Sequence, residues 1–539
     1  MSHPGVPSTL LPNALLFRGV LSMKHAIIAL VSILVLSCSP TTLKDAPPDG
    51  VNAISLELVR NHAFFLASDS LKGRSSPSPE LDVAAHYIAH VFESNGFQAV
   101  QRSYFNKVPL NIVSLGEENA LAVTKEGTTR SYEIKTEFTP FDMTANRSVS
   151  GPIVFAGYGI TAPEFFYDDY GGIEVRGKIV FVLRHEPGEE DTSSVFEGAK
   201  ATKYSNVVEK VRIAQEHGAV AVMVATDPLN HTLLTPRGFP WPSLSKFLPK
   251  DALPISLGTD EERKIPVVHV GVEVISQLFG SVDSLRNLQQ AIDKSVSPRS
   301  FEIASSTAVI QTSTAIKDMT AQNVVGYLEG TDPSLKKEIV VVGAHYDHVG
   351  TQKTGQPGED LIFNGADDNA SGTTALLAVA AAFGHSPVKP KRSVLLMAFA
   401  AEERGLLGSR SYVENPLFPL DQTVAMLNLD MVGRNSYDSL SVIGGSKSPD
   451  LAQIAQEENA KVGFTLVVEN LSSGGSDHMS FQQKNVPFLF FFSGFHPDYH
   501  KVTDHADLLN IPKIARVATL TFRTAWRVAN EDRKYKLIP

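Results

Sequence analysis

The second half of the chain predicts an α/β fold, with helices covering both faces of a mostly parallel central sheet. Two observations indicate this fold. From Asn323 onward, nearly continuous apolar runs suit strands that are buried on both faces. Segments with helical periodicity alternate with those runs, as in α/β domains. The expected strands are Ile339 to Gly343, Val394 to Phe399, Val424 to Leu429 and Phe488 to Phe492, and the expected helices are Thr373 to Phe383, Leu407 to Tyr412 and Leu451 to Val462.

A mixed, β-rich module is predicted for residues 151–300, where the texture of the sequence changes. Short apolar segments predict strands at Pro152 to Tyr158, Lys178 to Leu183 and Ala219 to Val224. An amphipathic helix is predicted over Val207 to His217, closed by Gly218. We expect this stretch to form a compact module that ends near Ser300, which the family resemblance given below implies is an insertion.

Two helices are predicted before the insertion, over Ile54 to Ser68 and Leu81 to Asn95, with Gly96 at the expected C-terminal cap. No strand pattern of their own lies beside them. We therefore expect residues 51–150 to pack on the later α/β domain of residues 301–539.

The first 50 residues predict export. Ala26 to Ser37 is an apolar run too short to span a membrane and suited to a signal peptide. Its end, Val35-Leu36-Ser37-Cys38, resembles a bacterial lipobox, which implies cleavage before Cys38 and lipidation of that residue. The alternative is an ordinary signal peptide that contains a cysteine. We therefore expect residues 1–37 to be the signal region, with Met23 as an alternative start of translation, and residues 38–50 to be a tether.

The length and composition of the chain exclude some classes of protein and of binding partner. The chain has 539 residues, which favours two domains, and a hydrophobic fraction of 43% is that of a globular protein. A formal charge of −10 with no basic tract disfavours nucleic acid as a partner. Cys38 is the single cysteine, so no disulfide is expected, and a membrane contact is expected only through a lipid on that residue.

Potential metal ligands follow most of the predicted strands of the α/β domain. Ligands gather at the carboxyl ends of strands in such sheets, so groups distant in sequence can converge there. Two imidazoles and three carboxylates suit a pair of divalent ions that share one carboxylate, and a further glutamate suits a general base. The segments and residues are AHYDH with His345, GADDNASG with Asp368, AEERGLLGS with Glu402 and Glu403, NLDMVG with Asp430, and YHKVTD with His500.

Each of these residues alone has a plainer interpretation. A histidine after a strand is usually a hydrogen-bonded loop residue, and a glutamate pair at a helix start is favoured by the helix dipole. GADDNASG alone would pass as a turn entering a helix. The joint occurrence of the set favours a metal site, because so many carboxylates would repel one another without a cation.

In this order, the five segments resemble the M28 family of co-catalytic zinc aminopeptidases and carboxypeptidases, over roughly residues 51–140 and 301–539. GYGITAPE, GKIVFVLR and AQEHGAVAVMVA in the insertion resemble the protease-associated (PA) domain. The resemblance implies a zinc-exopeptidase (phosphorylase/hydrolase-like) fold, two zinc ions and a peptide substrate.

The resemblance also implies a role for each residue. Asp368 would bridge the two ions, with Asp367 as a supporting residue. One ion would take His345 and Asp430, and the other Glu403 and His500. Glu402 would be the general base, and Asp347 would accept the other ring N–H of His345.

Several alternatives remain open at the level of the sequence. An aminopeptidase is favoured over a carboxypeptidase or dipeptidase, a glutaminyl-cyclase-like transferase, a non-catalytic receptor-like protein, and a surface binding module with a structural metal. Cobalt or manganese could replace zinc. Substrate specificity and oligomeric state are not encoded in these motifs.

Some residues keep two interpretations. His348 could compete with His345 as a ligand, but its position past the strand favours another direction. Ser476, Asp477 and His478 are interpreted as supporting or substrate-contacting residues rather than a nucleophile pair. Tyr499 could contact substrate, and Asp504 could orient His500 or cap a turn. The acidic loop Glu189-Glu190-Asp191 could bind a cation, although a solvated loop is favoured.

Overall fold

The computed structural model describes residues 45–196, 198, 201–236, 248–249, 252–258, 264–352, 355–469 and 475–538. The predicted signal region, Cys38 and most of the tether lie outside these ranges. Among the described residues, none of the helices has the length and apolar character that a membrane span requires.

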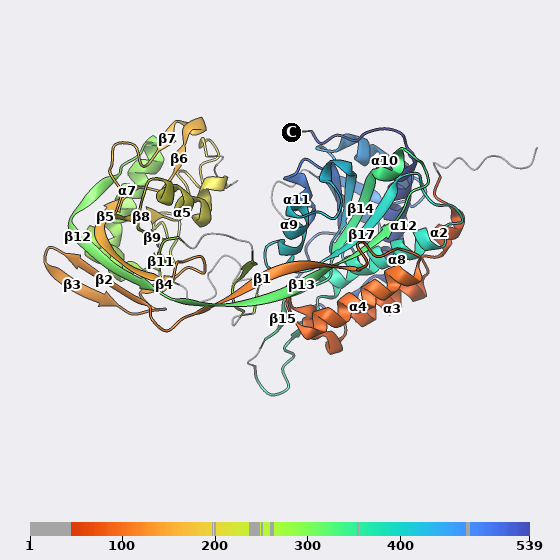
Figure 1. Ribbon diagram of the computed structural model, residues 1–539, viewed down its shortest axis with the longest axis horizontal. Helices are drawn as coiled ribbons and strands as arrows, with labels where there is room; N and C mark the ends of the chain where they lie inside the picture. The colour runs from red at the N-terminus through yellow and green to blue at the C-terminus, as the bar shows by residue number, and fades with distance from the viewer. Residues whose placement is uncertain are drawn as a thin grey trace, which may run out of the picture. The chain divides into compact units, whose positions relative to one another are not determined.

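Two sheets, shown in Figure 1, organise the described chain. The larger has nine strands and contains the predicted α/β segments. In spatial order its strands are β10 (Ile255–Leu257), β1 (Phe105–Leu115), β13 (Thr314–Leu328), β17 (Ser393–Phe399), β14 (Ile339–His345), β18 (Thr423–Leu429), β21 (Phe488–Phe492), β19 (Ser439–Ile443) and β20 (Thr465–Glu469).

The centre of this sheet is parallel. Strands β17, β14, β18 and β21 run in the same direction, whereas β13 and β19 flank them in antiparallel pairs. The predicted α/β fold is confirmed, but the sheet is mixed rather than mostly parallel: besides the central group only β19 and β20 form a parallel pair among the described strands of this sheet, and β10, β1 and β13 pair in antiparallel fashion. All residues of β14, β17 and β21 are buried, which explains why each reads as an unbroken apolar run.

Helices cover both faces of the central strands. Alternate residues of a strand point to opposite faces, so Val340 and Val342 of β14 join one cluster of buried side chains and Val341 joins another. The first cluster includes residues of α3, α4, α8 and α12, and the second includes Tyr412 of α9 and Phe481 of α11. The helices of this part are α2 (Pro48–Asn52), α3 (Leu56–Leu66), α4 (Pro79–Ser94), α8 (Gly372–Gly384), α9 (Leu407–Glu414), α10 (Pro449–Asn459), α11 (His478–Gln482) and α12 (Ile511–Asn530), with the short turns η1 (Asp69–Arg74), η4 (Leu335–Lys337), η5 (Ala366–Ser371), η6 (Leu420–Gln422) and η7 (Ala506–Leu508).

The two N-terminal helices pack on this domain, as predicted. Ser55 caps α3 and Ser78 caps α4, each side chain accepting a backbone N–H of the first turn. Helix α3 packs against α8 and α12, and α4 packs against β13 and α8. Gly96, at a positive φ of 78°, follows the end of α4 where the cap was expected.

The second sheet has eight strands and contains the inserted module. In spatial order its strands are β3 (Thr128–Tyr132), β2 (Ala120–Lys125), β12 (Phe301–Thr312), β5 (Arg147–Phe155), β8 (Ile179–Leu183), β9 (Ala221–Ala225), β11 (Val267–Val270) and β4 (Phe138–Pro140). Its helices are α5 (Val207–Glu216), α6 (Val272–Phe279) and α7 (Val282–Ser295), with the turns η2 (Pro163–Phe165) and η3 (Lys203–Ser205). Two further pairs of short antiparallel strands belong to neither large sheet. They are β6 (Thr161–Ala162) with β7 (Tyr167–Asp168), and β15 (Gly350–Thr351) with β16 (Ile362–Phe363).

This sheet extends beyond the range 151–300 expected for the insertion. Strands β2, β3 and β4 come from the preceding segment, and β12 comes from the following one. The reason is pairing: β12 lies between β2 and β5, so chain on both sides of the predicted range completes one sheet. The domain bounds themselves stay a prediction.

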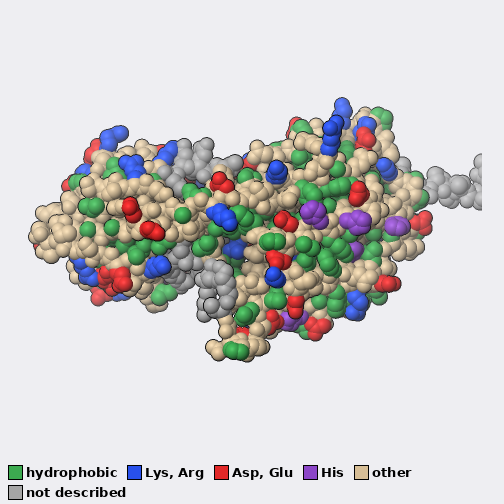
Figure 2. Space-filling model, turned by 60° about the horizontal axis from the view of Figure 1, so that its bottom comes forward, with side chains coloured by type: hydrophobic (Ala, Val, Ile, Leu, Met, Phe, Trp, Pro, Cys, Tyr) green, Lys and Arg blue, Asp and Glu red, His purple; other side chains and the backbone are tan. Residues whose placement is uncertain are grey.

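Charges are mixed on the face of the molecule drawn in Figure 2. Acidic and basic side chains are interspersed there, without an extended patch of one sign among the described residues. The distribution gives no field of one sign over that face.

Candidate metal centre

The predicted ligands meet at the carboxyl ends of the central parallel strands. His345 is the last residue of β14, and Asp430 directly follows β18. Glu402 and Glu403 lie just after β17, and His500 lies in the loop after β21. Asp368 belongs to η5, directly before α8. All of these side chains are at most 12% exposed.

Two groups of donor atoms share Asp368. His345 Nε2 lies 3.3 Å from both Asp368 Oδ1 and Asp430 Oδ1. His500 Nε2 lies 3.0 Å from Asp368 Oδ2 and 3.1 Å from Glu403 Oε2. Ligand atoms about 2.0–2.2 Å from one tetrahedral zinc stand about 3.3–3.5 Å apart, so both groups have a suitable spacing. The two oxygens of Asp368 thus face different histidines.

Glu402 lies beside these groups. Its Oε2 is 3.9 Å from His345 Nε2, farther than the oxygens of Asp368 and Asp430. Glu402 and Glu403 still come close enough to His345 to be a possible ligand group, so distance alone does not exclude Glu402 as a ligand. Burial raises the pKa of the Glu402 carboxyl well above its usual value.

The carboxylates favour positive charge at the histidines. Burial lowers the pKa of His500, but Glu403 and Asp368 outweigh it and raise the pKa to about 12. Burial raises the pKa of Glu403, as does Asp368, but His500 and His348 prevail and lower it to about 2. A site that attracts a proton so strongly suits a cation, and Asp430 Oδ1 makes no hydrogen bond to a described residue.

The contacts of Asp347 differ from the expected hydrogen bond between its carboxylate and the ring N–H of His345. His345 Nδ1 lies 3.2 Å from the backbone oxygen of Asp347 and 3.7 Å from its carboxylate Oδ1. Oδ1 instead accepts the backbone N–H of Glu402, at 3.1 Å. The carbonyl can hold a proton on Nδ1, which leaves Nε2 as the donor atom, while the carboxylate positions Glu402.

The His348 side chain points into the site, whereas its position past the strand predicted that it would point elsewhere. Its Nδ1 lies 2.6 Å from Glu403 Oε1 and 3.9 Å from Asp368 Oδ2, and the ring is buried. A side chain at Gly365 would collide with this ring, because a Cβ there would lie 2.4 Å from His348 Cγ. No local pattern in the sequence predicts this direction, because the residues after β14 are not helical and the i, i+3 spacing from His345 therefore has no fixed geometry.

Arg74 is a buried residue of the site that the sequence did not single out. It is 1% exposed, and its guanidinium donates to the carbonyl oxygens of Tyr346 at 2.8 Å, Asn364 at 2.7 Å, Gly365 at 2.9 Å and Leu66. Burial lowers the pKa of Arg74 to about 10, against the carboxylates that raise it. Arg74 thus ties together the two segments that carry His345 and Asp368.

We predict that Arg74→Met lowers the free energy of unfolding by about 3 kcal/mol or more, because several buried carbonyls lose their donor. Urea unfolding followed by circular dichroism measures the change. The control is Arg60→Met, at an exposed position on α3. Equal unfolding midpoints for the two variants would contradict this role.

Asp367 and Asp504 support the Asp368 segment. Asp504 Oδ2 accepts the backbone N–H groups of Asp367, at 2.9 Å, and Asp368, at 3.2 Å. Asp367 Oδ1 accepts the N–H of Gly433 at 2.6 Å, and its Oδ2 lies 3.3 Å from His496 Nε2. Asp504 therefore fixes the backbone at Asp367 and Asp368, a role that the sequence did not predict.

Ser476 and His478 do not form a nucleophile pair. Ser476 Oγ accepts a hydrogen bond from Asn428 at 2.8 Å. The His478 ring stacks on Phe488 and Phe490, and burial lowers its pKa to about 3. Asp477 is fully buried near the site, and burial raises its pKa to about 7.

Three residues of the site, none of them glycine, have a left-handed backbone. Ala401 precedes Glu402 with a φ of 56°, Met431 follows Asp430 with 49°, and His500 itself has 53°. Such conformations are uncommon for residues with a side chain and cluster at functional sites. Ala401 and Met431 bend the chain just after β17 and β18, next to Glu402 and Asp430, and His500 bends the loop after β21. The Tyr499 ring lies 4.1 Å from that of His500.

Family comparisons match both parts of the chain. Residues 323–525 match the model described as peptidase family M28, and residues 149–278 match that of the PA domain. The first range contains most strands of the larger sheet, and the second contains β8, β9, β11 and most of β5 of the smaller one.

Individual relatives agree with these matches. The chain is 24% identical over 499 residues to "Probable lipoprotein aminopeptidase LpqL" of Mycobacterium tuberculosis, covering 85% of this chain and 81% of that protein. It is 28% identical over 236 residues to "Aminopeptidase YwaD" of Bacillus subtilis, covering 42% of this chain and 48% of the relative, so it spans about half of that protein's length. The solved structure "Aminopeptidase from Aneurinibacillus sp. strain AM-1" matches with a TM-score of 0.55 and 21% identity, covering 91% of this chain and 98% of the other.

Proposed function

Since the chain carries a peptidase family M28 domain and a PA domain, we propose that it is an aminopeptidase with two zinc ions at the candidate metal centre. One observation carries the proposal: Asp368 presents one oxygen to His345 and the other to His500. A structural site for one ion would need neither a shared carboxylate nor the additional Glu402. Both relatives are named as aminopeptidases, which supports this choice of function.

The proposed ligands are His345 and Asp430 on one side, Glu403 and His500 on the other, and Asp368 between them. A pair of bound divalent ions would supply an acidic water and polarise a peptide carbonyl. Glu402 takes the proton of the attacking water and returns it to the leaving amine. Asp347 holds the backbone of Glu402 in place for this transfer, and His348 holds one oxygen of Glu403.

We predict that aminoacyl reporter substrates are cleaved, that a chelator abolishes the cleavage, and that zinc restores it. The panel also contains N-blocked peptides, C-terminal reporters and an N-terminal glutaminyl peptide. Cleavage of N-blocked peptides alone would reject the aminopeptidase, and release of C-terminal residues would indicate a carboxypeptidase. Cyclisation of the glutaminyl peptide alone would indicate a transferase. Activity that resists the chelator would reject the metal centre.

We further propose that the protein is exported and held at the cell envelope by a lipid on Cys38. The support is the sequence Val35-Leu36-Ser37-Cys38, which resembles a lipobox, and the similarity to a relative named as a probable lipoprotein. The tether after Cys38 would place the catalytic domain outside the membrane that holds the lipid.

A further inference from the structure

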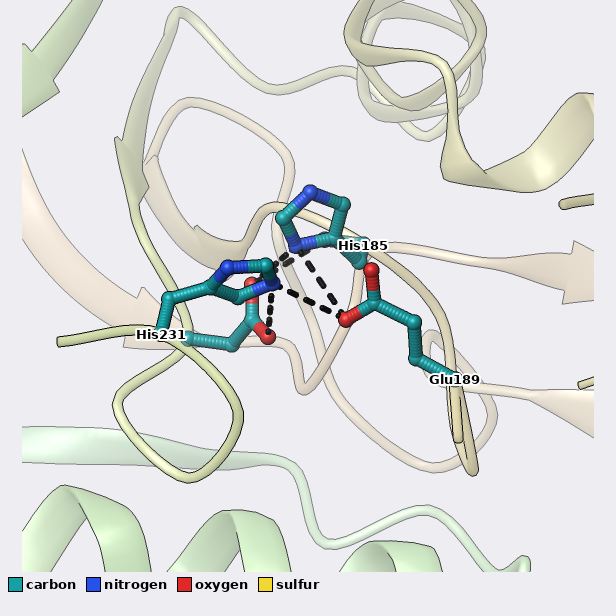
Figure 3. A group of neighbouring side chains, drawn as sticks. His185, Glu189 and His231 are labelled. Atoms are coloured by element: carbon teal, nitrogen blue, oxygen red, sulfur yellow. Dashed lines mark hydrogen bonds and ion pairs between the residues drawn. The ribbon is translucent and has the colours of Figure 1, made fainter. Parts of the chain in front are cut away.

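A second group of histidines and carboxylates lies in the inserted module, apart from the candidate metal centre. It consists of His185, Glu189, Asp227 and His231, each of which offers one ligand atom within 4.8 Å of the others. Figure 3 shows the two imidazole rings and the Glu189 carboxylate pointing toward one another.

The fold of the module brings these residues together. Strands β8 and β9 are parallel neighbours, with Leu183 opposite Ala225 at their carboxyl ends. His185 lies just after β8, and Asp227 lies just after β9. The loops that follow the two strands therefore leave the same edge of the sheet, which is where ligands collect in parallel sheets.

The distances are close to those of a coordination sphere. His231 Nε2 lies 3.0 Å from Glu189 Oε2 and 3.5 Å from Asp227 Oδ2. His185 Nδ1 lies 3.6 Å from Glu189 Oε2 and 2.5 Å from Asp227 Oδ1. Donor atoms of one tetrahedral zinc stand about 3.3–3.5 Å apart. The 2.5 Å contact would lengthen by about 1 Å as the Nδ1 proton leaves.

Asp227 provides an independent indication of a ligand. Its side chain is only 1% exposed, and its Oδ2 makes no hydrogen bond to a described residue although it faces His231. A buried carboxylate oxygen without a donor is costly unless a cation or another partner satisfies it. The other three side chains are 19% to 34% exposed, so an ion can reach the group from solvent.

The backbone beneath the group is held in place. Lys210 Nζ donates to the carbonyl oxygens of His185 at 2.5 Å and Tyr158 at 2.6 Å, and it is fully buried. Glu186 accepts the backbone N–H of Thr202 at 2.7 Å. The His185 loop is therefore anchored at His185 itself and at the residue that follows it, as a preformed site requires.

We propose that His185, Glu189, Asp227 and His231 bind one structural zinc ion in the PA-like module. Two neutral imidazoles and two carboxylates balance the charge of a divalent ion, and imidazole favours zinc over calcium or magnesium. Four ligands from the protein close a tetrahedral site, so the ion would connect the loops after β8 and β9 rather than act on substrate. This proposal does not depend on the function of the first site.

The decisive experiment measures zinc per chain in the full-length protein and locates it by anomalous scattering at the zinc edge. We expect a peak at the loops after β8 and β9. The double variant His185→Gln/His231→Gln should contain one zinc fewer per chain than the wild type. The matched control His217→Gln, another partly exposed histidine of the same module, should keep the wild-type content.

Two further measurements keep the test decisive. If the double variant does not fold, Asp227→Asn replaces it, and the anomalous peak of the wild type needs no variant at all. Removal of metal from the first site through Asp368→Asn should leave the second peak unchanged. Equal zinc in wild type and variants, with no peak beside β8 and β9, would overturn the proposal and leave a network of histidine–carboxylate hydrogen bonds.

Discussion

Glu402→Gln is expected to lower turnover by about 10²–10⁴-fold and to leave the zinc content unchanged, because the variant loses the proton acceptor but no ligand. Gln keeps the shape of the side chain, and the hydrogen bond from the Glu402 backbone to Asp347 does not involve the side chain. Steady-state kinetics on an aminoacyl substrate and metal analysis of the same sample measure both quantities.

The control for Glu402→Gln is Glu414→Gln at an exposed position near the end of α9, which should retain full activity. Near-normal turnover of Glu402→Gln would reject Glu402 as the general base. Loss of zinc together with turnover would instead identify Glu402 as a ligand, an arrangement that its proximity to His345 and Glu403 leaves open.

Asp368→Asn is expected to weaken metal binding on both sides of the first site and to lower activity by at least about 100-fold, since even changes in the shell around a metal cause losses up to that size. Asp368 is the residue whose two oxygens face both His345 and His500. The amide that replaces it offers one oxygen and no charge. Zinc titration by calorimetry and the zinc content after dialysis measure the change.

Asp430→Asn provides the comparison, because Asp430 faces His345 and not His500. Asp430→Asn should weaken the binding of one zinc ion, whereas Asp368→Asn should weaken the binding of both. Asp421→Asn, at an exposed position in η6, should change neither. If Asp368→Asn and Asp430→Asn lose the same amount of zinc, Asp368 is not shared between two ions.

The two proposed metal sites arise from the same feature of parallel sheets. In both sheets the chain leaves neighbouring parallel strands at one edge, and polar loop residues meet there. The first site combines a shared carboxylate with an additional glutamate, which suits catalysis. The second offers four ligands from the protein, enough to close a tetrahedral site, which suits a structural ion.

Much of the fold followed from local patterns. Strands β14, β17, β18 and β21 are buried on both faces, so their apolar runs were distinct in the sequence. Strand β13 was not predicted, because most of its first half is exposed and carries no alternating pattern. The amphipathic pattern of α5 predicted its start at Val207, and its end to within one residue.

The sequence by itself determined the candidate ligands of the first site, because most of them directly follow recognisable strands and parallel strands end at one edge. Tertiary structure alone decided the parts that depend on loop packing. His348 turns toward Glu403, Arg74 reaches carbonyl groups far along the chain, and Asp347 contacts Glu402 rather than His345 through its carboxylate. His185 and His231 come together for the same reason. Side-chain direction in a loop is set by the neighbours that pack against it, and periodicity in the sequence does not encode those neighbours.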